Sequence, residues 1–204
     1  MGFVSSIVLP MLVLCFGQLM SVSNGQIVER TYSGKIQVNN GMGWGSWGHR
    51  DMCPYGTYAT GFSLKVEQSV GDGDDTALNG IALRCTKPMG STQQPQPYST
   101  VQSDTGSWGS WTQNNWCPNG VLQAFQLRVE SGQGRGDDTA ANNIRFSCTG
   151  GVQLTGSGMS WGEWGGWSEK CVGTGICGIQ TKVESPQGSG DDTALNDVKF
   201  YCCY

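Results

Sequence analysis

The sequence predicts an all-β protein with threefold internal symmetry and a disulfide-bonded frame. A stretch of the form Gly-Asp-Asp-Thr-Ala, followed by an alternating strand pattern, occurs three times along the 204 residues. A Trp-Gly-x-Trp element precedes each copy, and cysteines recur in the same register. No segment shows helical periodicity, so a regular repeat of short strands decides the fold class.

Each Gly-Asp-Asp stretch predicts a turn that leads into a strand. The copies begin at Gly73, Gly136 and Gly190, and the strands that follow reach Cys85, Cys148 and Cys202. Glycine and aspartate suit tight turns. The apolar and polar residues that alternate before each cysteine have the period of a half-buried strand.

Three further elements accompany each copy in the same order. A second alternating strand precedes the turn, at residues 62–67, 125–130 and 179–184. Upstream of that strand lies the tryptophan element, at Trp44/Trp47, Trp108/Trp111 and Trp161/Trp164. A weaker strand pattern precedes the tryptophans, at residues 35–38, 98–101 and 152–154. Each unit therefore supplies about four short strands. We place the units at about residues 30–85, 95–148 and 150–204 of one domain that spans residues 26–204.

The architecture follows from what one unit can bury. A single unit hides only one face of its sheet. Three sheets that face a common axis bury all three apolar faces together and leave few long open edges. This arrangement is a β-prism of three four-stranded sheets with pseudo-threefold symmetry. A sandwich of about twelve strands or a β-trefoil is the alternative.

The N-terminus predicts export. The first 25 residues contain no Asp, Glu, Lys or Arg, and residues 4–20 are mostly apolar. Ser23 and Gly25 precede a cleavage point before Gln26 at the positions that small residues occupy in secretory signal peptides, although the usual basic residue near the start is absent. A membrane anchor is the alternative, and the short apolar run with Pro10 inside it argues against one. We expect a signal peptide at residues 1–25 and a mature chain secreted to the extracellular space.

The cysteines agree with secretion. Of nine cysteines, Cys15 leaves with the signal peptide, and the other eight predict four disulfides. Equivalent places in the three units give the pairs Cys53–Cys85, Cys117–Cys148 and Cys171–Cys202, which leaves Cys177–Cys203. The partner of Cys171 stays open between Cys202 and Cys203, because adjacent residues of a strand point to opposite faces.

Charge and composition exclude several classes of partner and cofactor. The net charge is −4 and the sequence shows no basic cluster, so nucleic acid and membranes are not expected partners. One histidine and no CxxC pair argue against a zinc site. We expect neither a metal nor a cofactor.

Together these motifs resemble the vitelline membrane outer layer protein 1 family. The resemblance rests on the triple Gly-Asp-Asp-Thr-Ala, the tryptophan pairs, the strand Phe-Ser-Leu-Lys-Val-Glu at 62–67 and the ending Asp-Val-Lys-Phe-Tyr-Cys-Cys at 197–203. It covers roughly residues 26–204. It implies a β-prism of Greek-key sheets, secretion, and a role in an extracellular coat of the kind that surrounds the egg in birds. The family's fold is similar to that of some carbohydrate-binding lectins, and the resemblance brings no catalytic residue.

The paired carboxylates Asp74/Asp75, Asp137/Asp138 and Asp191/Asp192 are the first candidate site. A glycosidase needs two carboxyl groups about 5–9.5 Å apart across one bond, and a calcium site needs about six to eight oxygens. The alternative is that one aspartate of each pair binds amides of its own turn. An active site is needed once, whereas the motif occurs three times. We therefore favour the turn and predict no catalytic or metal-binding residue.

The tryptophans are the second candidate, because an indole ring packs against a sugar ring as it does against other apolar surfaces. We expect Trp44, Trp108 and Trp161, with their partners, to fill the core near one end of each sheet, since they recur at equivalent places. Trp116 and Trp167 lack a counterpart in all three units. We predict these two as the sugar-stacking residues.

The other polar candidates receive structural interpretations. His49 is interpreted as a solvated loop residue, because no nucleophile motif accompanies it. Lys65, Arg128 and Lys182 precede Val-Glu pairs and are expected on the outward faces of their strands, where ion pairs add little stability.

These observations predict a secreted, non-enzymatic structural constituent of an extracellular coat or matrix. Its partners would be extracellular glycoproteins or polysaccharides, bound through repeated weak contacts on three similar faces. A lectin-like carbohydrate-binding protein is the alternative, and an enzyme that acts on N-acetylated amino-sugar oligomers is a distant third.

Overall fold

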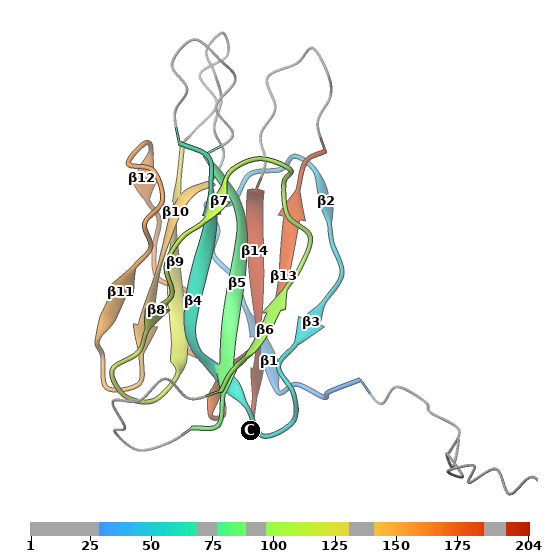
Figure 1. Ribbon diagram of the computed structural model, residues 1–204, viewed down its shortest axis with the longest axis vertical. Coiled ribbons are helices and arrows are strands. Elements are labelled where there is room, and N and C mark those ends of the chain that lie inside the picture. Colours follow the sequence, from blue (N-terminus) through green and yellow to red (C-terminus); the bar gives the residue numbers. More distant parts are fainter. Residues whose placement is uncertain (1–28, 69–76, 89–96, 131–140, 186–194) are drawn as a thin grey trace, which may run out of the picture.

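The computed structural model describes residues 29–68, 77–88, 97–130, 141–185 and 195–204. These residues form fourteen β-strands in three antiparallel sheets, with the long strands running along the longest dimension of the molecule (Figure 1). The all-β prediction is confirmed. Within the described residues there is no helix of the length and apolarity that a membrane span requires.

Each sheet has two long central strands and short strands beside them. Sheet A contains β1 (Gly34–Ile36), β2 (Ser46–Trp47), β3 (Asp51–Met52), β13 (Gly175–Val183) and β14 (Leu195–Cys203). Sheet B contains β4 (Tyr58–Val66), β5 (Leu78–Thr86), β6 (Ser99–Gln102), β7 (Ser110–Trp111) and β8 (Asn115–Trp116). Sheet C contains β9 (Leu122–Val129), β10 (Ala141–Cys148), β11 (Gln153–Thr155) and β12 (Glu163–Trp164).

The strand order in each sheet is that of a Greek key. Sheet B has the order β6-β5-β4-β7, and sheet C has the order β11-β10-β9-β12. In both sheets two long strands form a hairpin. The next short strand in the chain pairs with the second long strand, and the one after it pairs with the first long strand, which gives the Greek-key order. Sheet A repeats the pattern as β1-β14-β13-β2. The β-prism of three four-stranded Greek-key sheets is confirmed, and the short strands β3 and β8 add to β13 and β4.

The sheets do not coincide with the sequence repeats, contrary to the interpretation that each unit forms its own sheet. The long strands of the first unit pair with short strands of the second, and those of the second pair with short strands of the third. The long strands of the third unit pair with β1 and β2 from the start of the chain, where Lys35 lies opposite Tyr201. Each unit therefore completes its neighbour's sheet, and the two ends of the chain close the ring.

The core lies on the common axis between the three sheets. Alternate residues of the long strands point inward and are fully buried, as the period of two predicts. Four phenylalanines meet there, with ring centroids 4.7–6.3 Å apart: Phe62, Phe125, Phe146 and Phe200. These edge-on and tilted contacts suit aromatic rings and join all three sheets in one core.

Each long hairpin carries two β-bulges at equivalent places. The first falls at Asn79, Asn142 and Asn196, which are fully buried, and their backbone carbonyls accept hydrogen bonds from Gly106, Met159 and Met42. The second bulge falls at Thr60, Gln123 and Cys177, whose carbonyls accept hydrogen bonds from Cys117, Cys171 and Cys53. The bulges therefore fix both ends of the short-strand segment that each unit contributes to the neighbouring sheet.

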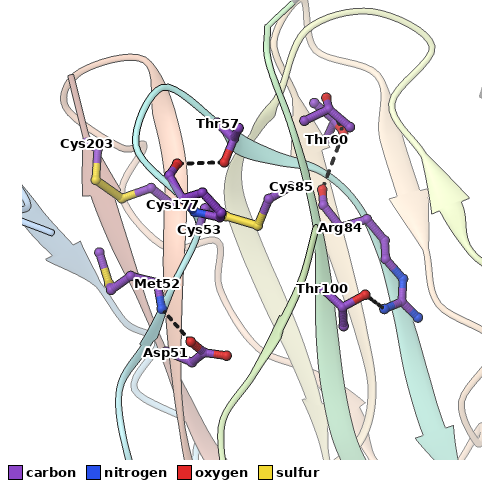
Figure 2. Close-up of a disulfide and its surroundings, with 12 residues drawn as sticks. Asp51, Met52, Cys53, Thr57, Thr60, Arg84, Cys85, Thr100, Cys177 and Cys203 are labelled. Atoms are coloured by element: carbon purple, nitrogen blue, oxygen red, sulfur yellow. Dashed lines mark hydrogen bonds between the residues drawn. A yellow bond between two sulfur atoms is a disulfide. The ribbon is translucent and has the colours of Figure 1, made fainter. Parts of the chain in front are cut away.

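The structure contains the four disulfides expected from register. Three of them join one sheet to the next: Cys53–Cys85 joins A to B, Cys117–Cys148 joins B to C, and Cys171–Cys202 joins C to A. The fourth, Cys177–Cys203, joins the two long strands of sheet A at a bulge. Figure 2 shows Cys53 and Cys177 side by side, where the Cys53 amide donates to the Cys177 carbonyl at 2.8 Å.

The adjacent cysteines at the end of β14 point to opposite faces. Cys202 belongs to the central core, whereas Cys203 lies in a small outer cluster with Tyr58, Val121 and Tyr201. This alternation explains why Cys202 pairs with Cys171 across the core edge and Cys203 with Cys177 on the outside.

Removal of an inter-sheet disulfide tests this arrangement. The variant Cys117→Ala/Cys148→Ala should lower the free energy of unfolding by about 3–4 kcal/mol, because the bond closes a loop of about 30 residues in the unfolded chain. Chemical denaturation followed by fluorescence measures the change. The Cys177–Cys203 disulfide closes a loop of similar length, so Cys177→Ala/Cys203→Ala should lower the free energy of unfolding by a similar amount. A loss below about 1 kcal/mol for the first variant would contradict the chain-entropy account.

Candidate functional site

The tryptophan elements form three equivalent turns at one end of the sheets. Gly45, Gly109 and Gly162 follow the first tryptophan and have φ angles of 75°, 82° and 70°. A Cβ at any of them would lie 2.2–2.4 Å from the carbonyl oxygen that ends the first long strand, at Val183, Val66 or Val129. Glycine is required at these positions for two reasons: the backbone has a left-handed conformation, and the carbonyl oxygen approaches too closely to leave room for a side chain.

A cation holds each of these turns. Lys65 Nζ donates to the Gly106 and Ser107 carbonyls at 2.8 and 2.9 Å. Arg128 Nε donates to the Gly162 carbonyl at 2.9 Å, and Lys182 Nζ donates to the Gly43 carbonyl. These three cations lie on the outer faces as expected, but their contacts are with turn carbonyls.

The expectation that the repeated tryptophans fill the core is wrong. Trp44 is 62% exposed and Trp108 is 54% exposed, and Trp161 is partly exposed. Their partners Trp47, Trp111 and Trp164 lie directly opposite Lys182, Lys65 and Arg128 in the sheet ladders. Directly opposite residues share a face, and these cations face outward, so the indoles lie on the outside of the prism. The phenylalanines and aliphatic residues of the long strands fill the core instead.

Trp116 lies on the outer face of sheet B. It is 37% exposed and pairs with Gly61, where a Cβ would come within 2.6 Å of the indole, so the missing side chain leaves room for the ring. Tyr98 packs against it edge-on with centroids 5.3 Å apart, and the Arg84 guanidinium lies 5.5 Å from the Tyr98 ring centre.

Arg84 is held firmly in this cluster. Its guanidinium donates to Asn114, Thr100 and Ser63 at 2.6–2.7 Å. Burial lowers the pKa of Arg84, and the neighbouring Tyr98 acts in the opposite direction. The guanidinium remains charged at neutral pH because arginine has so high a starting value. Figure 2 shows it extended beside Thr100.

Trp167 lies on a different face, that of sheet C. It is 38% exposed, and the Arg145 guanidinium lies between it and Trp164, 5.5 and 4.6 Å from the two ring centres. Arg145 Nε donates to Gln126 Oε1 at 2.5 Å, and Gln126 Nε2 donates to the Gly165 carbonyl at 2.5 Å. Trp116 and Trp167 therefore belong to two separate clusters, each an aromatic surface beside fixed N–H donors.

This combination suits a sugar better than it suits catalysis. A partly exposed indole offers an apolar plane, and amide and guanidinium groups beside it offer hydrogen bonds to hydroxyl oxygens. The sequence pointed to the two tryptophans as candidates but not to their neighbours Tyr98, Arg84, Arg145 and Gln126, because that proximity depends on pairing between units.

The described part of the structure adds no support for the candidate catalytic and metal-binding residues. The Gly-Asp-Asp aspartates lie outside the described residues. In the part of the chain that is described, no three His, Cys, Asp or Glu side chains form a group that could hold a metal. His49 Nδ1 lies 2.6 Å from Asp104 Oδ1, with both side chains largely exposed. The pair sits where sheet A meets sheet B, since Ser103 Oγ also donates to the His49 carbonyl at 2.6 Å.

Comparison with known proteins identifies close relatives. The family model described as vitelline membrane outer layer protein I matches residues 34–204. The vitelline membrane outer layer protein 1 homolog of Mus musculus is 48% identical over 193 residues, which cover 94% of this chain and 92% of that protein. The Homo sapiens homolog of the same name is 51% identical over 176 residues, covering 84% of each.

Two solved structures have a related shape at low sequence identity. Calystegia sepium agglutinin is 13% identical, with a TM-score of 0.48, covering 85% of this chain and 97% of that one. The second β-prism domain of RbmC from V. cholerae is 12% identical, with a TM-score of 0.43, covering 81% of this chain and 98% of that one.

Substitution in a tryptophan turn tests the role of its glycine. Gly109→Ala should lower the free energy of unfolding by more than about 3 kcal/mol, because left-handed strain and a backbone clash add. Gly56→Ala is the matched control: Gly56 has a φ of 74°, but nothing lies within 4 Å of its Cβ position. It should lose about 1–2 kcal/mol from strain alone. Equal losses in thermal or chemical denaturation would contradict the steric argument.

Proposed function

The chain belongs to the vitelline membrane outer layer protein I family, and from that membership we propose that it is a secreted structural constituent of an extracellular coat or matrix. The resemblance noted from the repeats is thereby confirmed. The observation that carries the proposal is the match over residues 34–204 together with identity to named homologs at about half of the aligned residues.

The frame of the molecule suits an extracellular coat. Three disulfides join the three sheets in a ring and a fourth reinforces sheet A, which favours a rigid protein in an oxidising compartment. We propose that the signal peptide at residues 1–25 directs secretion and that the mature chain begins at Gln26.

The N-terminal part of the mature chain is fixed to the frame close to this cleavage point. The Arg30 guanidinium is buried and donates to the carbonyls of Cys53, Pro54 and Thr57 at 2.7–2.9 Å. It also lies over the Tyr58 ring, 5.0 Å from its centre. A chain that starts at Gln26 thus retains this anchor.

Attachment to the coat is proposed to occur through the outer faces of the sheets. The Trp116 cluster and the Trp167 cluster each present an aromatic plane with fixed hydrogen-bond donors, and they lie on different sheets. Two separate weak sites on one rigid body favour adhesion to a multivalent glycoprotein or polysaccharide, because linked contacts raise avidity. The proposal includes no catalytic step.

Sugar binding by the two clusters is testable with fluorescence. Titration with chito-oligosaccharides at millimolar concentration should shift the tryptophan emission of the secreted protein. Trp116→Ala and Trp167→Ala should each weaken binding at the substituted cluster by roughly tenfold, as expected for loss of a stacked aromatic contact, and leave binding at the other cluster unchanged. Trp108→Ala, also exposed but outside both clusters, should leave the affinity unchanged. No shift at millimolar sugar would remove the two clusters as sites for this class of sugar.

Extraction distinguishes a coat constituent from a lectin. Cells that express the full chain should release a protein that begins at Gln26 and is recovered with the insoluble extracellular matrix. A coat constituent should resist elution by free sugar because it is held by many contacts, whereas a lectin should elute with a competing sugar. A product found only in solution, without association with the matrix, would contradict the proposed function.

A further inference from the structure

Three lysines from distant parts of the chain meet on the outer face of sheet A. Lys35 is in β1, Lys182 in β13 and Lys199 in β14, which are neighbouring strands. Lys35 lies opposite Tyr201 and Lys182 opposite Asp197, so both are diagonal neighbours of Lys199 on one face. Lys199 Nζ lies 3.4 Å from the centre of the Trp47 ring. The closure of β1 onto β14 creates this cluster, which is why the linear sequence shows no basic run.

The pseudo-symmetry provides an internal comparison. The places of Lys35, Lys182 and Lys199 in sheet A correspond to Thr100, Lys65 and Ala82 in sheet B, and to Gln153, Arg128 and Arg145 in sheet C. The second member is a cation in every sheet because it holds the tryptophan turn. The other two are both basic only in sheet A. The lysine cluster is therefore a departure from the repeat, which the turn does not require.

The described acids near the cluster form no ion pair with its lysines. Among the described residues, neither ion pair of the structure involves the three lysines, and Glu29 pairs with Arg50. Asp197 lies beside the cluster but is largely covered, since a Cβ on Gly41 would come within 2.3 Å of its carboxyl carbon. Burial raises the pKa of Asp197, and the backbone amide of Val198 and the charges of Lys182 and Lys199 act in the opposite direction.

The lysines also act on one another. Burial lowers the pKa of Lys199, and Lys35 and Lys182 lower it further, while Asp197 opposes them. Repulsion of this kind costs stability in the free protein and is relieved when an anion binds among the cations.

We propose that the outer face of sheet A binds an acidic polysaccharide, with Lys35, Lys182 and Lys199 contacting sulfate or carboxylate groups and Trp47 flanking them. The proposal rests on the proposed function, for which it names the ligand class of one face. The three lysines lie on adjacent strands, and adjacent strands are about 5 Å apart. A row of cations across the strands suits an extended chain with charges along its length. Nucleic acid and anionic membranes fit less well, because they are bound through larger basic surfaces than three lysines provide.

Binding to dextran sulfate, with neutral dextran as the comparison, tests the proposal. The secreted wild-type protein should bind dextran sulfate and not dextran, and raising the salt from about 0.05 to 0.5 M should abolish binding by screening. Lys35→Gln/Lys199→Gln should weaken binding on the order of tenfold. Lys35→Gln alone should show part of the loss, and Lys35 is an exposed residue whose substitution spares the fold. Asp197→Asn removes the neighbouring negative charge and should strengthen binding.

A charge-matched control separates the site from net charge. Lys87→Gln/Lys170→Gln removes two exposed positive charges from elsewhere and should change affinity by less than about twofold. Equal weakening in both double variants, or no binding of dextran sulfate by the wild type, would overturn the proposal. Matrix association is measured on the same samples. If it persists without dextran sulfate binding, only this inference fails, whereas loss of both removes the proposed function as well.

Discussion

Pairing between repeats is the constraint on which the rest of the structure depends. The short strands of each unit pair with the long hairpin of a neighbouring unit, and β1 and β2 pair with β14 and β13, the hairpin at the end of the chain. The buried bulges at Asn79, Asn142 and Asn196 receive the incoming segments, and one disulfide fixes each junction. No unit can satisfy the edges of its long strands alone, so the three units are expected to fold as one cooperative body.

Much of this frame could be predicted from residue patterns. Period-two alternation identified the long strands, and equivalent cysteine places gave the three pairs that join the sheets, with Cys177–Cys203 as the remainder. The choice between Cys202 and Cys203 for Cys171 stayed open until the structure showed Cys202. The partner of each hairpin could not be read in the same way, because a short strand such as Gly34–Ile36 carries too few residues to specify where it pairs. The error on Trp44 and Trp108 has the same origin. They are exposed because the glycine after each tryptophan, Gly45 or Gly109, has a left-handed conformation and packs against the end of a strand from another unit. That packing is a tertiary contact.

The outer faces carry what distinguishes the three sheets. Inside, equivalent positions hold similar apolar residues, since a common axis requires similar volumes. On the outside, the equivalent position of the second long strand is Ala82 in sheet B, Arg145 in sheet C and Lys199 in sheet A. The surrounding residues form an aromatic cluster in sheet B, an arginine with two indoles in sheet C and a group of lysines in sheet A. A symmetric frame thus presents three chemically different surfaces. That difference is the feature most relevant to a protein that attaches to a mixed extracellular coat.

Chemical cross-linking of lysines tests the closure of the ring most directly. A short amine-reactive reagent applied to the native protein, followed by digestion and mass spectrometry, reports which lysines are neighbours. The pairing of β1 with β14 predicts a link between Lys35 and Lys199, near the two ends of the chain, and the loss of that link on denaturation with the disulfides reduced. Links from Lys35 only to Lys65 of its own repeat or to Lys87 just after it, with none to Lys199, would contradict the pairing of β1 with β14.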